Sequence, residues 1–281
     1  MYFEFITQAI SRIIPDSKFK RKISKIYSQY SSFLGERYLR SISLRTLLDL
    51  KKLSVPYEVR GGMVRVLIED FDILIYLNNI SIVKEVFVEK VYLRNKLEEG
   101  DVVVDCGAHV GTFSLLASRI VGKSGVVIAI EPAKENLKIL KRNIRKNRVK
   151  NIIIVPKALW SSRGKMELGI SEVNPGEHSL LHRNALHQNL SSEIIRADTL
   201  DNILRELRVR KVDFIKMDIE GAEIEALKGM ERTLRNDVKL AIASYHIVNG
   251  RKTINFVIPF LKERGFKISV DKKNHIIHAR K

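Results

Sequence analysis

The chain has 281 residues, of which 45% are hydrophobic and 29% are charged. This length and apolar content exclude a mainly disordered protein and suffice for one large domain with an extension. Lys and Arg number 50 against 32 acidic residues, which gives a net charge of +18. This charge favours anionic partners such as nucleic acid, an acidic membrane surface or a phosphorylated substrate. The same composition is also typical of heat-adapted proteins.

The cysteine content and the apolar runs bear on the cellular compartment. A single cysteine, Cys106, excludes an internal disulfide framework and fits a reducing environment. No apolar run is long enough to predict a membrane-spanning helix. Residues 1–14 carry Glu4 and Arg12 within their apolar stretch, which predicts an amphipathic helix rather than a signal peptide. We therefore expect a cytoplasmic location, with peripheral association with a membrane as the alternative.

Three regions follow one another along the chain. Residues 1–55 are basic with helical spacing and form an extension that ends at Pro56. Residues 56–100 form a β segment and a helix that lead into the core. Residues 101–281 form the expected catalytic domain.

The middle region has two different periodicities. The β-rich runs at 64–68 and 71–76 are separated only by Glu69 and Asp70. Residues 82–97 then show helical spacing, and we expect this helix to form one wall of a ligand cleft.

From residue 101 onward, predicted strands alternate with predicted helices. The strands lie at 102–105, 126–131, 152–155, 212–217 and 238–244, and the helices at 112–121, 134–148, 222–234 and 254–264, with an irregular stretch after the third strand. This alternation predicts an α/β fold, a doubly wound parallel sheet with helices on both faces. Two final strands, 266–270 and 275–279, are joined by a short polar turn and form an antiparallel hairpin. A parallel sheet that ends in such a hairpin is typical of the Rossmann-like class I methyltransferase fold.

A tight turn follows the first strand of this domain. Gly107 and Gly111 lack Cβ atoms, so the backbone there can approach a ligand closely. The spacing Asp-x-Gly-x-x-x-Gly differs from the Gly-x-Gly-x-x-Gly that cradles a pyrophosphate, and it suits a ligand without phosphate. The predicted cofactor contacts of this turn are Asp105, Gly107, Ala108, His109, Gly111 and Thr112.

The next two strands end in further candidate cofactor contacts. Glu131 ends the second strand, where a carboxylate can accept hydrogen bonds from both hydroxyls of a ribose, and Pro132 follows it. Lys157 and Ala158 follow the third strand, where an adenine edge would rest. Trp160 is a candidate for the adenine pocket or for the core.

A charged strand end lies at 216–220. On a continuous strand Lys216, Asp218 and Glu220 would share one face, and three charges there indicate a polar cleft. Gly221 permits a sharp exit into the next helix, and Glu223 falls in its first turn, where the helix dipole favours an acid.

From about Phe71 to the C-terminus the sequence resembles the FkbM family of methyltransferases. The resemblance rests on 103–111, Glu131-Pro132, 140–147, 197–201 and above all on Lys216-Met-Asp-Ile-Glu-Gly-Ala-Glu223. It implies S-adenosylmethionine as cofactor and methylation of oxygen, often of sugar hydroxyls on natural products, glycans or lipid-linked saccharides. This chain has Ala243-Ser-Tyr-His246 where the family pattern leads us to expect an acid before the histidine.

The candidate catalytic residues are Asp218, His246, Lys216 and Glu220, and Asp218 is also a candidate cofactor contact. Methyl transfer from a sulfonium requires alignment of the acceptor with the methyl group, and an alcohol acceptor also has to lose its proton. We expect Asp218 and His246 to flank the acceptor hydroxyl, with Lys216 and Glu220 holding the site in register. His246 could instead be a structural histidine.

The sequence predicts no metal site. His178 and His182 have helical spacing, but no third ligand is evident near them, and the polar stretch 171–192 is better explained as a mobile lid over the substrate. The basic helix 134–150 is explained by a solvated outer face, with Leu137, Leu140 and Ile144 turned inward.

Two other functions compete with methylation of a glycan, lipid-linked saccharide or small metabolite. An RNA methyltransferase could use the basic N-terminal region to bind nucleic acid, and a non-catalytic protein could use the same region to bind an anionic surface. The acceptor, the need for a metal, the oligomeric state and the role of residues 1–55 are not determined by the sequence.

Overall fold

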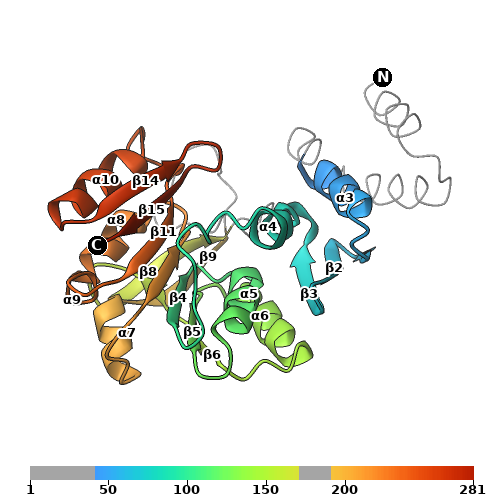
Figure 1. Ribbon diagram of the computed structural model, residues 1–281, viewed down its shortest axis with the longest axis horizontal. Coiled ribbons are helices and arrows are strands. Elements are labelled where there is room, and N and C mark those ends of the chain that lie inside the picture. The colour runs from blue at the N-terminus through green and yellow to red at the C-terminus, as the bar shows by residue number, and fades with distance from the viewer. Residues whose placement is uncertain (1–41, 171–190) are drawn as a thin grey trace.

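A seven-stranded sheet forms the centre of the computed structural model, which describes residues 42–170 and 191–281 (Figure 1). In spatial order its strands are β14 (Lys267–Asp271), β15 (Ile276–Arg280), β11 (Lys239–Ala243), β10 (Phe214–Met217), β4 (Val102–Cys106), β5 (Val126–Ile130) and β6 (Ile152–Val155). The strands from β11 to β6 are parallel, and β15 runs antiparallel to both of its neighbours. The predicted class I methyltransferase architecture with a C-terminal hairpin is confirmed.

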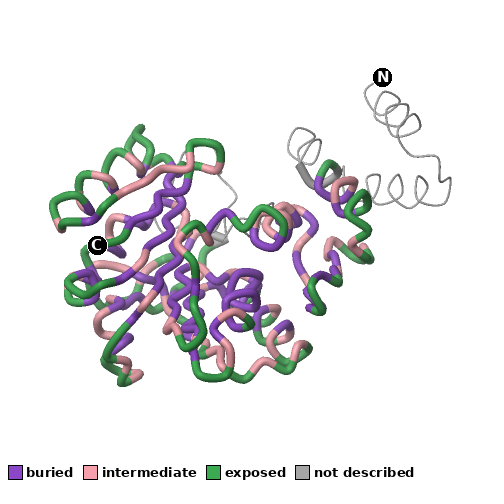
Figure 2. The backbone as a smooth tube through the Cα atoms, in the orientation of Figure 1, coloured by how far each residue is buried: buried purple, intermediate pink, exposed green. Residues whose placement is uncertain are grey.

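Helices cover both faces of this sheet because successive strand residues point to opposite sides. These helices are α5 (Thr112–Val121), α6 (Lys134–Lys146), α7 (Leu200–Glu206), α8 (Glu223–Lys228), α9 (Glu231–Leu234) and α10 (Ile254–Glu263). Val103 packs in one apolar cluster with Phe113 of α5, whereas Val104 packs in another with residues of α7 to α10. Buried positions therefore follow the central strands on both sides (Figure 2).

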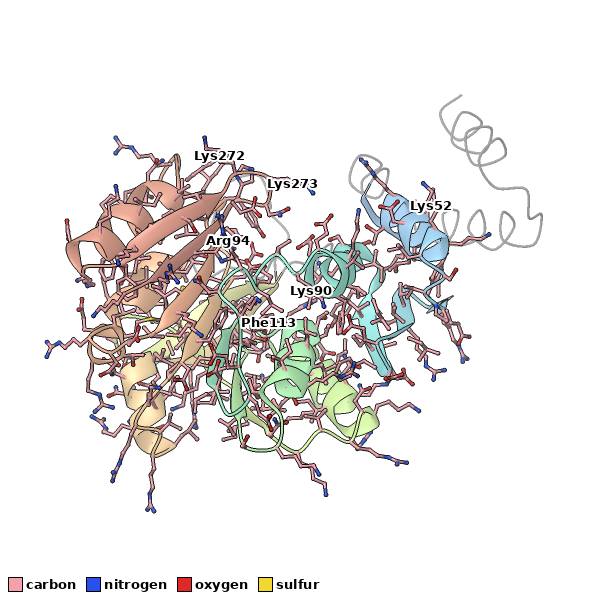
Figure 3. The ribbon with its side chains drawn as sticks, viewed as in Figure 1. Lys52, Lys90, Arg94, Phe113, Lys272 and Lys273 are labelled. Atoms are coloured by element: carbon pink, nitrogen blue, oxygen red, sulfur yellow. The ribbon has the colours of Figure 1, made fainter. Side chains whose placement is uncertain are left out.

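The high positive charge lies mainly on solvated surfaces. Lys272 and Lys273 project outward from the turn between β14 and β15, whereas Phe113 lies inside the fold (Figure 3). In α6, Leu137 and Leu140 are buried, as predicted for a helix with a solvated basic face. None of the helices within 42–170 and 191–281 is both long and apolar enough to cross a bilayer.

A second sheet precedes the central one and lies beside α5 and α6 (Figure 1). Helix α3 (Ile42–Lys52) leads into an antiparallel meander of β1 (Tyr57–Arg60), β2 (Met63–Ile68) and β3 (Phe71–Tyr76). The side-chain amides of Asn143 and Asn147 form hydrogen bonds with the backbone of β3, as a neighbouring strand would. The Asn143 amide bonds to both backbone groups of Leu74, and the Asn147 amide does the same at Asp72.

The helix predicted over 82–97 is wrong in its second half. The chain forms short helical turns, η1 (Leu77–Asn79), α4 (Ser81–Val83) and η2 (Lys84–Val88), and is then irregular. Lys90 has a φ of 50°, which no right-handed helix accommodates. Val91, Tyr92 and Leu97, which created the helical spacing, are buried from this irregular segment instead.

The stretch after β6 contains more regular structure than the sequence predicted. It forms a three-stranded sheet of β7 (Ala158–Leu159), β9 (Ser191–Asp198) and β8 (Gly164–Ile170), and a two-stranded ribbon, β12 (Ile247–Val248) with β13 (Arg251–Lys252), follows β11. The helix predicted at 222–234 is divided into α8 and α9 at Gly229. The backbone packs closely there, since a Cβ on Gly229 would lie 2.2 Å from the Trp160 carbonyl oxygen.

Candidate active site

The loop between β4 and α5 presses against the end of β10. Gly107 has a φ of 77°, and a Cβ there would lie only 2.0 Å from the carbonyl oxygen of Asp218. Gly111 has a φ of 87°, and its Cβ would lie 2.4 Å from Leu140 Cδ1. Gly107 therefore permits the contact between the loop and β10, whereas Gly111 permits the packing of α5 against α6.

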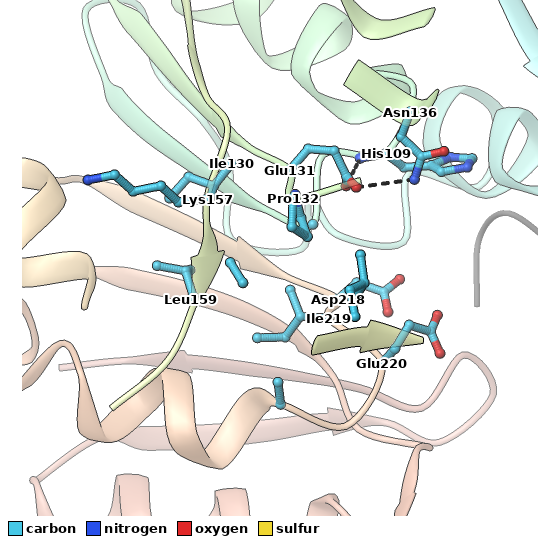
Figure 4. A pocket seen from close by; sticks show the side chains of 14 residues that line it. His109, Ile130, Glu131, Pro132, Asn136, Lys157, Leu159, Asp218, Ile219 and Glu220 are labelled. Atoms are coloured by element: carbon cyan, nitrogen blue, oxygen red, sulfur yellow. Dashed lines mark hydrogen bonds between the residues drawn. The ribbon is translucent and has the colours of Figure 1, made fainter. Parts of the chain in front are cut away.

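A cleft opens at this point, at the carboxyl ends of β4, β5 and β10 (Figure 4). Its volume is about 570 Å³ with the open mouth included, and it is lined by Gly107, His109, Ile130, Glu131, Pro132, Asn136, Lys157, Ala158, Leu159, Leu168, Asp218, Ile219, Glu220 and Ala222. Eight of these residues were candidate site residues in the sequence. The apolar walls and Asn136 were missed, because nothing in their local sequence distinguishes them from core positions.

Glu131 is fixed from three sides at the base of the cleft. Its Oε2 accepts the N–H of His109 at 2.9 Å, and its Oε1 accepts the N–H of Ala133 at 3.0 Å and Nδ2 of Asn136 at 3.1 Å. Burial raises the pKa of this carboxyl, while the three hydrogen bonds oppose that rise. A carboxylate offers about four acceptor positions, so Glu131 retains capacity for a ligand hydroxyl, which is the chemistry a ribose requires.

Asp105 and Lys216 lie behind the cleft rather than in it. Asp105 is fully buried, with Ser114 Oγ at 2.6 Å and Lys216 Nζ at 3.1 Å from its carboxylate. Lys216 also donates to the carbonyl of Gly107 at 2.8 Å. The prediction that Lys216, Asp218 and Glu220 share one strand face is wrong, because β10 ends at Met217 and Glu220 has a φ of 55°.

The remaining predicted cofactor contacts differ in their positions. Ala108 donates its N–H to Ile130 and Thr112 begins α5, and neither lines the cleft. Lys157 lines it, but its ammonium group points away from the acidic side chains and binds Asp198 and Glu206, at 2.9 and 2.8 Å (Figure 4). Pro132 and Ala158 contribute apolar wall.

Asp218 connects the cleft to a second group of polar side chains. Its Oδ2 accepts the hydroxyl of Tyr92 at 2.9 Å, and its Oδ1 lies 3.5 Å from His246 Nε2. Glu220 Oε2 lies 3.4 Å from the same nitrogen, and Glu223 Oε1 lies 2.9 Å from His246 Nδ1. The structure thus brings together Asp218, Glu220 and His246, which the sequence predicted, and Tyr92 and Glu223, to which the sequence gave no place in the site.

The concentration of carboxylates dominates the electrostatics of this group. Burial alone lowers the pKa of His246, but Glu220, Glu223 and Asp218 outweigh burial and raise it to about 11. Burial and the charge of Asp218 raise the pKa of the Glu85 carboxyl. The same two causes raise the pKa of Tyr92. The group therefore favours positive charge and disfavours further negative charge.

An apolar hollow lies next to this group, on the side of α8 and β12. It is lined by Trp160, Gly221, Ile224, Glu225, Val248, Asn249, Thr253 and Phe256. Trp160 therefore belongs to this hollow and does not line the cleft at Glu131, so it is not placed where the sequence suggested an adenine pocket. His178, His182 and most of the lid predicted at 171–192 lie outside the described residues.

The sequence matches the family described as methyltransferase FkbM domain over residues 105–268, more than half of the chain. It is 26% identical over 218 residues to methyltransferase sdnD of Sordaria araneosa, covering 68% of this chain and 83% of that protein. It is 24% identical over 213 residues to 31-O-demethyl-FK506 methyltransferase FkbM of Streptomyces tacrolimicus, covering 66% and 80%. It is 28% identical over 155 residues to hexuronic acid methyltransferase AglP of Haloferax volcanii, covering 55% and 59%.

Among solved structures, an FkbM methyltransferase from Methylobacillus flagellatus aligns with a TM-score of 0.48 and 17% identity, covering 98% of this chain and 76% of that one.

Proposed function

The chain belongs to the FkbM methyltransferase family, and on that premise we propose that it methylates a hydroxyl oxygen of a glycan, a lipid-linked saccharide or a small metabolite. As a methyltransferase of this family, it uses S-adenosylmethionine as its cofactor. The proposal rests on one observation above all: Asp218 lines the cofactor cleft and also contacts the polar group around His246. A methyl group delivered in the cleft would therefore meet an acceptor bound beside Asp218.

The cleft has the chemistry that the cofactor needs. Glu131 would hold the ribose hydroxyls, and Ile130, Leu159 and Ile219 would enclose the adenine with apolar surface. Asp105 and Lys216 would act as positioning residues, because together they brace the loop at Gly107 from behind. The bound cofactor supplies an already activated methyl group, so the protein chiefly aligns the acceptor with it.

Asp218 is the proposed acceptor of the hydroxyl proton. Its Oδ2 is held by Tyr92, which fixes the carboxylate, and its Oδ1 faces the space shared with His246. While no cation is bound, the carboxylates of Glu220, Glu223 and Asp218 raise the pKa of His246 to about 11. The imidazole then holds a proton and would stabilise Asp218 and Glu220 rather than act as a base, and a cation bound at Nε2 would displace that proton. Replacement of Asp218 by Ala should abolish turnover while S-adenosylhomocysteine, measured by calorimetry, still binds.

Two relatives support an oxygen acceptor. The names of the Haloferax volcanii and Streptomyces tacrolimicus proteins specify methylation of a hexuronic acid and of 31-O-demethyl-FK506. The decisive test is transfer of labelled methyl from S-adenosylmethionine to host extract separated into RNA, protein, lipid, glycan and small-molecule fractions. We expect label in one of the last three. Label confined to RNA would contradict the proposal and favour an RNA methyltransferase.

A further inference from the structure

Three potential metal ligands converge beside the cofactor cleft. Asp218 and Glu220 follow β10, and His246 follows β11, the neighbouring parallel strand. One ligand atom from each side chain lies within 4.8 Å of the other two. Parallel strands end at the same edge of a sheet, which explains how residues 28 and 26 positions apart in the sequence meet here.

Four buried atoms of this group have no hydrogen-bond partner within the described residues. They are Nδ1 and Nε2 of His246, a residue only 7% exposed, Oδ1 of Asp218 and Oε2 of Glu223. The distances of 3.4 and 3.5 Å from Nε2 to Glu220 and Asp218 exceed the usual N–H···O range. Buried polar atoms are nearly always bonded, so two that face one another without a bond indicate space for a ligand between them.

Glu223 orients the histidine toward that space. It is fully buried, and its Oε1 accepts the N–H groups of Ile219 and Gly221 while lying 2.9 Å from His246 Nδ1. A carboxylate next to one ring nitrogen of a histidine directs the other nitrogen to a metal, and metal-binding histidines almost always have such a partner. In this chain the nitrogen so directed is Nε2.

The local charge also favours a cation. Glu85, Asp218, Glu220 and Glu223 bring four carboxylates to the group, and the last three lie within 3.5 Å of the His246 ring nitrogens. The ammonium of Lys216 contacts Asp105 and the carbonyl of Gly107, so it offsets the charge of Asp218 only from a distance.

We propose that Asp218, Glu220 and His246 bind one divalent cation of the Mg²⁺ or Mn²⁺ class. The two carboxylate oxygens suit such an ion, and three protein ligands leave open positions for water and for an acceptor oxygen. At an open position the cation would orient the acceptor hydroxyl and stabilise negative charge on its oxygen. This catalytic part rests on the proposed function, whereas the binding of the cation does not.

The test uses the full chain, first treated with EDTA and then titrated with Mn²⁺, which is followed by electron paramagnetic resonance. We expect one Mn²⁺ per chain, displaced by Mg²⁺. Asp218→Asn, Glu220→Gln and His246→Gln should each nearly abolish binding. Glu223→Gln should weaken it by about 10–100-fold, because Glu223 only orients a ligand. Glu263→Gln, a change at an exposed acid on α10, is the matched control and should bind Mn²⁺ normally.

Thermal unfolding of each variant separates loss of the site from loss of the fold. The inference is overturned if the folded wild-type chain binds no Mn²⁺ at about 1 mM, a concentration that even weak sites for hard cations bind. It is equally overturned if the three ligand variants bind as the wild type does. S-adenosylhomocysteine binding, measured in parallel, tests the proposed function separately: its presence without Mn²⁺ binding rejects only the cation.

Discussion

Replacement of Gly107 by Ala tests the close contact between the loop that joins β4 to α5 and the end of β10. The new Cβ would lie 2.0 Å from the carbonyl oxygen of Asp218, and real Cβ contacts stay beyond 3.0 Å, so the loop or the strand end has to move by about 1 Å. A misplacement of that size at reacting groups can cost about 100-fold in rate, which is roughly 2.7 kcal/mol of transition-state stabilisation.

A second cost comes from the backbone itself. At a φ of 77° an alanine is strained by about 1–2 kcal/mol, and each kcal/mol lowers the melting temperature of a chain of this size by about 2–4 °C. Gly265→Ala is the matched control, because Gly265 has a φ of 81° and a Cβ added there would have nothing within 4 Å. It should show only the loss of stability that comes from the backbone strain, without a loss of activity.

The two variants are compared by thermal unfolding and by initial rates of labelled methyl transfer to the fraction that the extract screen identifies. We expect Gly107→Ala to be about 100-fold slower than Gly265→Ala. Equal rates in the two variants would refute the argument that this contact aligns the cofactor with Asp218.

Three further predictions follow from the described contacts. Glu131→Gln replaces one acceptor oxygen by an amide donor and removes the charge, so calorimetry should find S-adenosylhomocysteine bound about 10–100-fold more weakly; unchanged affinity would remove Glu131 from the cofactor site. Asn143→Ala removes the 2.9 Å hydrogen bonds to the backbone of Leu74 and to the Val110 carbonyl. Urea unfolding should show that the free energy of unfolding falls by roughly 3 kcal/mol. A fall below about 1 kcal/mol would mean that β3 does not depend on these hydrogen bonds. Burial works against ionisation of Asp198, but its bonds to Lys157, Asn202 and Arg163 prevail and lower its pKa to about 2. The carboxylate therefore contributes about 2 kcal/mol of stability above pH 4, which is lost as the pH falls toward 2. Asp198→Asn should reduce this pH dependence of the free energy of unfolding. The same dependence on acid pH in the variant and the wild type would contradict the prediction.

The sequence predicted most of the central sheet because the signals there are local. The strands at 102–105 and 126–131 are runs of β-branched and small apolar residues, and the structure forms β4 and β5 within about one residue of them. The hairpin was predicted from a short polar turn between two such runs. Each of these patterns is contained within a few neighbouring residues.

Where a pattern depended on distant partners, the sequence was misleading. The helical spacing at 82–97 was produced by Val91, Tyr92 and Leu97, which are buried because other parts of the chain surround them. The Tyr92 hydroxyl bonds to Asp218, a residue 126 positions away. No local periodicity contains such a contact, so neither the end of η2 nor the place of Tyr92 in the site could be predicted.

By itself the sequence determined the α/β class, the glycine turn at Gly107 and the acid at Glu131, because each of these depends on backbone freedom or on the end of one strand. Only the tertiary structure decided which of the other charged residues lie behind the cleft and which lie at its edge. Asp105 and Lys216 form a buried pair behind the cleft, whereas Asp218 and Glu220 meet His246 at its edge. The physical reason is that alternation along a strand assigns a side chain to a face, but β10 ends at Met217, and beyond it the neighbouring strands and helices decide what each side chain contacts.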